Sequence, residues 1–264
     1  MRRWIDKVLF CLAVLTFPVI APAAEMAADK GVRLAREADA RFSGFGDSVA
    51  AMHMILRNAR GDEAVRALRI KTLEVDGEGD RSLVIFDQPR DIAGTALLSH
   101  SRGVEPDDQW LYLPELKRVK RISGANRSGP FMGSEFAFED LTAPEVAKYD
   151  HLWLRDAPCG PFTCHVIERR PRYTGSGYSR QEVWLDSAEL RPMRVDFFDR
   201  RGDHIKTLTY GDYRLYEGRF WRAHDLFMEN LRTGKSTRLV VSQFAFRTGL
   251  SEADFSRASL KRVR

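Results

Sequence analysis

The chain has 264 residues, of which 44% are hydrophobic and 30% are charged, and its formal net charge is +5 at pH 7. A chain of this length can bury a full core, about 70–75% of the surface that it exposes when unfolded. Acids and bases are interspersed, and no Lys/Arg cluster is interleaved with stacking aromatic residues, which argues against a nucleic-acid-binding protein.

The N-terminus has the features of a secretory signal peptide. A cationic start with Arg2, Arg3 and Lys7 precedes an apolar run from Val8 to Ile20, and Ala21-Pro22-Ala23 fits an A-x-A cleavage site. The apolar run is shorter than the span of about 20 residues that a membrane-crossing helix needs. We therefore predict a signal peptide over residues 1–23 and an exported, periplasmic chain.

The alternatives at this end are a retained membrane anchor and a lipoprotein signal at Cys11. The second is disfavoured because Phe10 stands where a small residue would be needed. Cleavage after Ala23 would leave residues 24–264 as a single domain with a net charge of +3. At most, this mildly basic balance suits an anionic membrane surface.

A helix is predicted over Ala27–Phe42. Apolar residues recur there at spacings of three and four, namely at Val32, Ala35, Ala38 and Phe42. Ser43-Gly44-Phe45-Gly46 ends the pattern. Because the apolar stripe is narrow and rich in alanine, packing against a sheet is favoured over membrane binding.

From Ser48 onward, apolar and polar residues alternate with the period of two that is typical of strands. Turn signals such as Asp76-Gly77 and Thr233-Gly234 punctuate the alternation, and no linker or repeat divides it. We predict ten to eleven consecutive, mostly antiparallel strands. A sheet this large must curl, split or close.

The stretch from Trp110 to Leu141 contains three local signals. Trp110–Leu113 and Arg118–Ile122 read as the strands of a hairpin that turns at Pro114-Glu115, and a polar loop, Gly124–Gly129, follows. Beyond the loop comes a segment that we call the plug, residues 131–141. Its apolar side chains are Phe131, Met132, Phe136, Phe138 and Leu141.

The plug has two interpretations from the residues alone. Its apolar side chains cannot all be buried within so short a segment, so they need an apolar surface beneath them. They either fill an open barrel as ordinary core or form a movable cover over a cavity. Gly133 and Ser134 interrupt the segment, and methionine suits a site that accommodates variable chains.

Cys159 and Cys164 are the two cysteines that remain after signal cleavage. An even count in an exported protein predicts a disulfide, here closing a short loop. The alternatives are a redox pair or metal ligands. Redox C-x-x-C motifs have two intervening residues, whereas four intervene here.

The sequence lacks the motifs of the common catalytic and metal centres. Its six histidines are scattered without metal-ligand spacing, and Ser134 lacks the flanking glycines of a nucleophile elbow. We therefore predict no catalytic residues, no metal and no cofactor.

The residues of the central stretch resemble a known family. The order W-x-Y-L-P, K-R-x-x-R-I and F-x-G-S-x-F-x-F-E-D-L over residues 110–141 is similar to bacterial periplasmic proteins of the outer-membrane lipoprotein-sorting (LolA-like) family. The resemblance implies an unclosed β-barrel with helices packed in its mouth, and carriage of a lipid-bearing ligand. It also favours the movable-plug interpretation.

The combined prediction is a mainly β fold with a few helices (α+β). A large, curved antiparallel sheet forms an unclosed half-barrel, with an N-terminal helix and a short helical plug on its concave side.

We expect a periplasmic carrier or chaperone that binds lipoprotein acyl chains or free lipid, with transient membrane contact and an inner-membrane transporter as a candidate partner. The alternatives are a lipid-sensing or transporter-accessory module and, less favoured, an exported enzyme. The predicted lipid-binding residues fall into two groups. Those expected to line or border the concave face are Trp110, Tyr112, Trp184, Met193, Val195 and Phe197, and those expected in the plug are Phe131, Met132, Phe136, Phe138 and Leu141.

Overall fold

The structure, a computed structural model, describes residues 21–75, 77, 79–143 and 145–262. The predicted signal peptide lies outside these residues except at positions 21–23, which begin helix α1 (Ala21–Phe42). Helix α1 ends at Phe42 as predicted but begins six residues earlier than the predicted start at Ala27. No helix in the described part of the chain has both the length and the apolar composition to cross a membrane.

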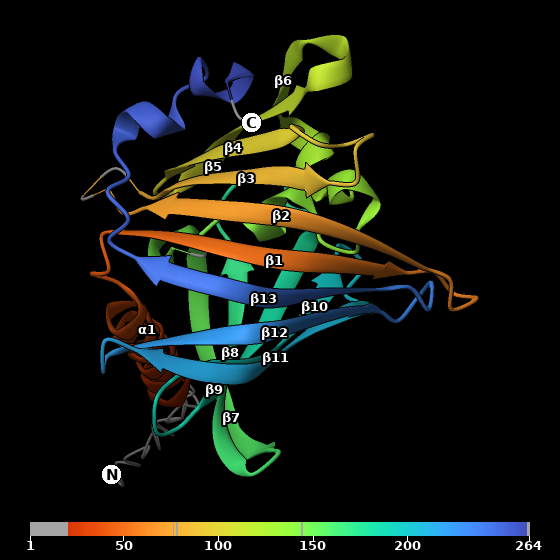
Figure 1. Ribbon diagram of the computed structural model, residues 1–264. Coiled ribbons are helices and arrows are strands. Elements are labelled where there is room, and N and C mark those ends of the chain that lie inside the picture. The colour runs from red at the N-terminus through yellow and green to blue at the C-terminus, as the bar shows by residue number, and fades with distance from the viewer. Residues whose placement is uncertain (1–20, 76, 78, 144, 263–264) are drawn as a thin grey trace, which may run out of the picture.

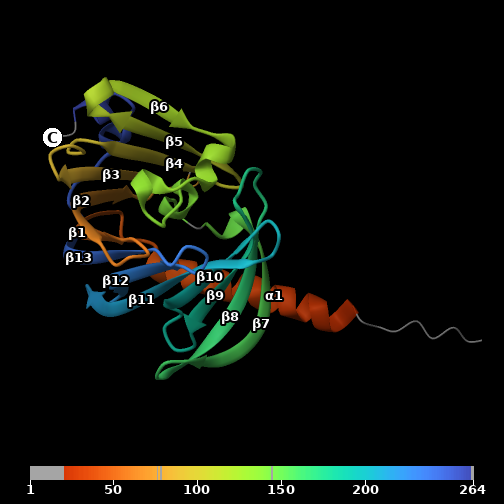
Figure 2. The ribbon, with the colours of Figure 1, turned by 90° about the vertical axis from the view of Figure 1, so that its right-hand side faces the viewer.

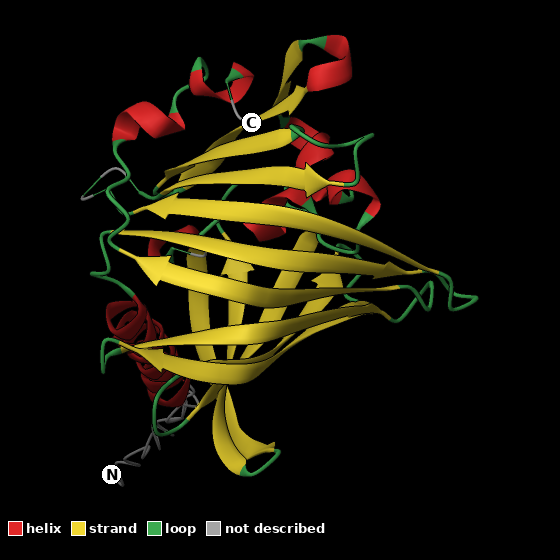
Figure 3. Cartoon of the chain, in the orientation of Figure 1, coloured by secondary structure: helices red, strands yellow, loops and turns green. Residues whose placement is uncertain are grey.

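The thirteen strands in the described part of the chain form one antiparallel sheet (Figures 1 and 3). The count exceeds the ten to eleven predicted, since alternation alone does not separate one long strand from two short ones. The strands are β1 (Asp47–Arg57), β2 (Glu63–Leu73), β3 (Arg81–Gln88), β4 (Ala96–Arg102), β5 (Glu105–Leu113), β6 (Arg118–Ile122), β7 (Tyr149–Cys159), β8 (Phe162–Pro171), β9 (Tyr178–Asp186), β10 (Pro192–Asp199), β11 (His204–Tyr216), β12 (Phe220–Asn230) and β13 (Ser236–Phe246).

The strand order explains why the barrel stays open. It runs β6-β5-β4-β3-β2-β1-β13-β12-β11-β10-β9-β8-β7, so β1 pairs with β13 and the free edges are β6 and β7. These two edges are consecutive in the chain, and the segment between them contains the plug. The predicted unclosed half-barrel is confirmed: the sheet curls, and the connection between its two edges occupies its concave side (Figure 2).

Register places one row of apolar side chains on the concave face. Pairing between neighbours aligns Ile167, Val183, Val195, Leu208 and Met228 across five strands. All five belong to one core cluster, which also contains Leu34 of α1. Because successive side chains of a strand point to opposite faces, this row fixes which residues face inward.

The plug is built from two 3-10 helices, η3 (Phe131–Gly133) and η4 (Phe138–Leu141). Phe131 is fully buried; its ring stacks on Phe86 of β3 at 5.6 Å between centroids and meets Phe138 edge-on at 5.5 Å. Lys206 of β11 pins the segment by an ion pair of 2.7 Å with Asp140. The plug therefore packs tightly against the concave face.

Helix α1 lies across one end of the half-barrel, at the left in Figure 1. It packs closely on β7 because Gly31 has no side chain: a Cβ there would lie 2.7 Å from the backbone nitrogen of Trp153. Gly31 and Leu34 are the buried centre of its inner face, while Ala35, Ala38 and Phe42 are half-buried beside them. The predicted stripe thus lies on the correct side, although Leu34 was not among its predicted members.

The outer face of the sheet carries a second, smaller core. The C-terminal segment forms η6 (Glu252–Phe255) and η7 (Ser259–Lys261), whose Phe255 and Leu260 are buried against β3 and β4. Trp110 and Tyr112 pack into this outer cluster. Their predicted position on the concave face is therefore wrong, because Trp110 pairs with Leu98 and Tyr112 with Ala96, both of which point outward.

Candidate functional site

The candidate site is a hollow of about 300 Å³ between α1 and the concave face of the sheet. One side is formed by α1, through Ala35, Ala38 and Phe42. The other side is formed by β8 to β11, and its apolar members are Ile167, Val183, Leu185, Pro192, Val195 and Tyr210, with Leu190 from the turn after β9. A mostly apolar concavity of this size lies at the small end of the range for ligand-binding pockets.

Only one residue of the predicted lipid-binding set, Val195, lines this hollow. Trp184 alternates with Val183 and Leu185 and so lies on the opposite face, where its Nε1 donates a hydrogen bond to Asp196 at 3.2 Å. Its predicted place on the concave face is therefore wrong. Met193 falls at an irregularity of the β9–β10 pairing, and Pro192 instead takes the lining position.

The remaining predicted residues lie together, but beside the hollow. Phe131, Phe136, Phe138 and Phe197 are buried in the main core, with Met132 and Leu141 half-buried against it. Leu141 lines a separate, smaller cavity of about 170 Å³ between the plug and β2 to β4. The structure thus shows the plug phenylalanines as packed core, and their predicted role in lipid binding remains a prediction.

The residues from α1 were missed as lining residues. The spacing of Ala35, Ala38 and Phe42 identified the inner face of the helix, but its small side chains were read as a packing stripe. Small residues on a helix that crosses a curved sheet leave space beneath them. That combination is the signal from which the hollow could have been inferred.

One end of the hollow is acidic. Asp39 of α1, Glu74 after β2 and Asp80 before β3 line it, and Glu145 lies beside them in an adjoining surface depression. Burial, reinforced by the neighbouring charges of Glu74, Glu145 and Asp39, raises the pKa of Asp80 from its ordinary value of 3.8 to about 6. Burial likewise raises the pKa of Asp39.

The substitution Asp80→Asn is expected to increase the free energy of unfolding at pH 7 by about 2–3 kcal/mol. Because the pKa of Asp80 is higher in the folded state, protonation stabilises the fold. That contribution is complete below about pH 4 and is lost as the pH rises through about 6. Urea unfolding across this range should therefore show a steeper decline in stability for the wild type than for the variant.

Asp29→Asn is the matched control, since Asp29 is an exposed carboxylate on α1. It should change the free energy of unfolding at pH 7 by less than about 0.5 kcal/mol, as is usual for an exposed side chain. A loss of stability at pH 7 in the Asp80→Asn variant would contradict this assignment.

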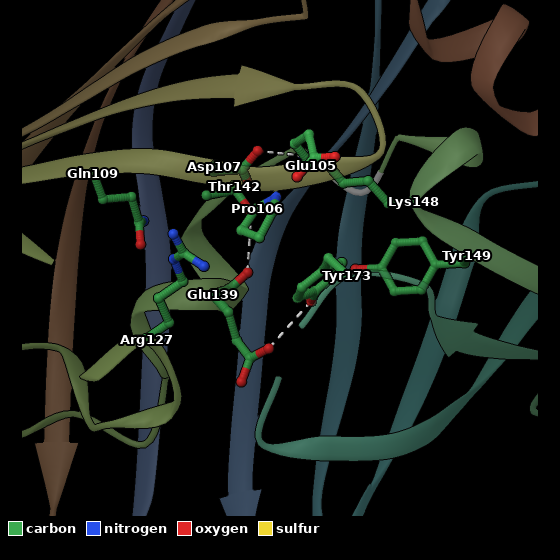
Figure 4. Close-up of a pocket in the computed structure, with 10 residues that line it drawn as sticks. All are labelled: Glu105, Pro106, Asp107, Gln109, Arg127, Glu139, Thr142, Lys148, Tyr149 and Tyr173. Carbon is green, nitrogen blue, oxygen red and sulfur yellow. Dashed lines mark hydrogen bonds and ion pairs between the residues drawn. The ribbon is translucent and has the colours of Figure 1, made fainter. Parts of the chain in front are cut away.

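A second, polar cavity lies where the plug meets β5 and β7 (Figure 4). Its volume of about 10 Å³ is comparable to the space that one water molecule needs. Buried Lys148 forms an ion pair of 2.5 Å with Asp107, and Glu139 accepts a hydrogen bond from Tyr173 at 3.1 Å. This cluster joins segments near the two free edges of the sheet, so its evident role is structural.

Cys159 and Cys164 form the predicted disulfide at the β7–β8 turn. Because both sulfur atoms belong to the disulfide, the structure excludes the alternative in which two free thiolates bind a metal ion. Among the described residues, no group of three or more His, Cys, Asp or Glu side chains is arranged to hold a metal ion.

Comparison with known proteins gives consistent matches over most of the chain. A family model described as an uncharacterized protein matches residues 78–262. A crystal structure described as an outer membrane lipoprotein-sorting protein domain from Vibrio parahaemolyticus is 53% identical. It has a TM-score of 0.87, with 89% of this chain and 100% of that chain covered.

Two further structures are similar. A DUF1329 family protein from Desulfovibrio piger is 30% identical, with a TM-score of 0.84 and coverage of 89% of this chain and 99% of that one. A LolA superfamily protein from Nitrosomonas europaea is 20% identical, with a TM-score of 0.69 and coverage of 86% and 97%. At that identity, the last match shows the shared fold alone. None of the curated proteins searched matches the chain.

Proposed function

The chain belongs to the LolA-like family of outer membrane lipoprotein-sorting proteins, and from this premise we propose that it is a periplasmic carrier for a lipid or a lipidated protein. The proposal includes export by a signal peptide over residues 1–23 and a single carrier domain over residues 24–264. The Cys159–Cys164 disulfide supports it, because disulfides persist in oxidising compartments such as the periplasm.

The observation that carries the proposal is the mostly apolar hollow of about 300 Å³ between α1 and the concave face of the sheet. Each methylene group moved from water into such a site contributes about 0.8 kcal/mol. An acyl chain therefore gains affinity without any hydrogen bond, and it can leave when a bilayer offers an equally apolar environment. Carriage of this kind needs no catalytic group, and no enzyme activity is proposed.

Filling the hollow tests the proposal. The substitution Val183→Trp places an indole among the residues that line the hollow, and we expect at least a tenfold weaker Kd for a fluorescent fatty-acid probe. Exclusion of only two methylene groups already loses about 1.6 kcal/mol, which exceeds a factor of ten. Fluorescence titration of the purified protein provides the measurement.

The matched control is Val65→Trp, the same substitution at a position that is 55% exposed on β2. It should bind the probe like the wild type. Ala38→Trp fills the hollow from the side of α1, and it replaces Val183→Trp in the titration if that variant does not fold. Unchanged probe affinity in a folded hollow variant would refute the proposed site.

A further inference from the structure

The β5–β6 hairpin carries a cationic, partly apolar tip at a free edge of the sheet. η1 (Pro114–Leu116) forms the turn, and β6 is the edge strand that follows. The hairpin projects at the top of the molecule in Figure 1, away from α1. We define the hairpin tip as residues 116–121.

The cations of this tip are largely free of acidic partners. Lys117, Arg118 and Lys120 are exposed, and no described acidic side chain forms an ion pair with any of them. Arg121 differs, since it forms an ion pair of 2.5 Å with Asp108. Three cations that form no ion pair with a described residue therefore lie within four residues, next to a single exposed carboxylate, that of Glu115 in the turn.

The same tip exposes an apolar side chain. Leu116 is 60% exposed, more than any other leucine named among the exposed hydrophobic residues. It precedes Lys117, whose backbone adopts the left-handed conformation with φ of 48° and turns the chain back into β6. The tip thus offers one apolar side chain directly beside cationic ones.

A second basic segment lies at the same end of the molecule. The C-terminal segment covers the outer face of β3 to β5, and its Arg257 lies over the ring of Trp110 at 5.8 Å from the centroid. Lys261 and Arg262 are exposed nearby in sequence. Figures 1 and 2 both show this segment close to the β6 edge.

Cations on an edge strand also protect it against pairing with other strands. That role accounts for Arg118 and Lys120 but not for Leu116, because an exposed leucine at an edge favours association. Apolar and cationic side chains together are typical of segments that lie in the interface of an anionic bilayer. An acidic protein surface would bind the cations of the hairpin tip but would not require the exposed Leu116.

We propose that the hairpin tip is the membrane-docking element of this protein, with Leu116 entering the interface and the three free cations meeting anionic phospholipid headgroups. This docking role rests on the proposed function, because a lipid carrier must reach a bilayer. The docking residues are remote from the hollow, so an experiment can refute one of the two proposals and leave the other in place.

The test is co-sedimentation with vesicles of equal parts phosphatidylcholine and phosphatidylglycerol, and with vesicles of phosphatidylcholine alone. Wild-type protein should bind the anionic vesicles and dissociate at high salt. The triple variant Lys117→Gln/Arg118→Gln/Lys120→Gln should bind on the order of a hundredfold more weakly, as expected for three interfacial cations. Leu116→Ser should weaken binding severalfold at unchanged charge.

The matched control removes three exposed cations elsewhere, in the variant Arg36→Gln/Arg201→Gln/Lys235→Gln. It has the same net charge as the hairpin variant and should retain most of the binding. Equal losses in the two triple variants would overturn the proposal, because net charge alone would then explain the binding. Wild-type protein that does not sediment with anionic vesicles would also overturn it and leave an acidic protein as the partner of this surface.

Probe binding by the same variants separates the two proposals. A hairpin variant that loses vesicle binding and keeps the fatty-acid probe supports the docking role. Wild-type protein that binds anionic vesicles but takes up no probe would refute the hollow and leave the docking proposal in place.

Discussion

Replacing Phe131 with alanine is expected to lower the free energy of unfolding by about 3–5 kcal/mol. Phe131 is fully buried between the plug and the sheet, in contact with the rings of Phe86 and Phe138. Its removal leaves a cavity that the pinned plug cannot close, because Lys206 and Arg66 hold neighbouring parts of the segment. Urea denaturation followed by tryptophan fluorescence provides the measurement.

The control is Phe227→Ala, the same truncation on β12 at a side chain that is 36% exposed. We expect this substitution to lower the free energy of unfolding far less than Phe131→Ala does. Similar losses for the two variants would show that the plug is loosely packed, and the interpretation as a movable cover would then regain support over that of ordinary core.

The substitution Lys148→Met is expected to lower the free energy of unfolding by about 3–5 kcal/mol, because it leaves the carboxylate of Asp107 buried without its cation. The two side chains are 2% and 10% exposed and lie 2.5 Å apart. Lys148 Nζ also donates to Ser101 at 2.6 Å, so the change breaks a link between η5 (Val146–Lys148) and two strands. Thermal and urea unfolding both report the loss.

Removing the charge of the partner should recover much of that stability. The double variant Lys148→Met/Asp107→Asn is expected to be more stable than Lys148→Met alone, because no unpaired charge stays buried. Arg60→Met breaks an exposed ion pair with Asp62 and should cost less than about 1 kcal/mol. A double variant less stable than Lys148→Met would contradict the electrostatic explanation.

Local features of the sequence predicted most of the architecture. The alternation of Arg118–Ile122, the proline turn before it and the end of the helix at Phe42 all appear in the structure. The pairing of Cys159 with Cys164 followed from their number and spacing. These features depend on backbone geometry and on neighbours a few residues away, which is why the sequence alone reveals them.

The side of the sheet on which an aromatic residue lies was harder to predict. Trp110 and Tyr112 are apolar enough for a concave face, yet they lie on the outer face under Phe255 and Leu260. A strand covered on both faces loses the contrast between apolar and polar positions that identifies its inner side. The cover here comes from a segment more than 130 positions later, which no local pattern indicates.

Alternation and turn signals are properties of the local chain, and they predicted one large antiparallel sheet with an apolar side. The place where that side is left unfilled is visible only in the folded protein. The phenylalanines of the plug pack against Phe86 and its neighbours, whereas Ala35 and Ala38 face Val183 and Val195 across open space. Whether apolar side chains meet or leave a hollow depends on the sizes of residues that only folding brings together.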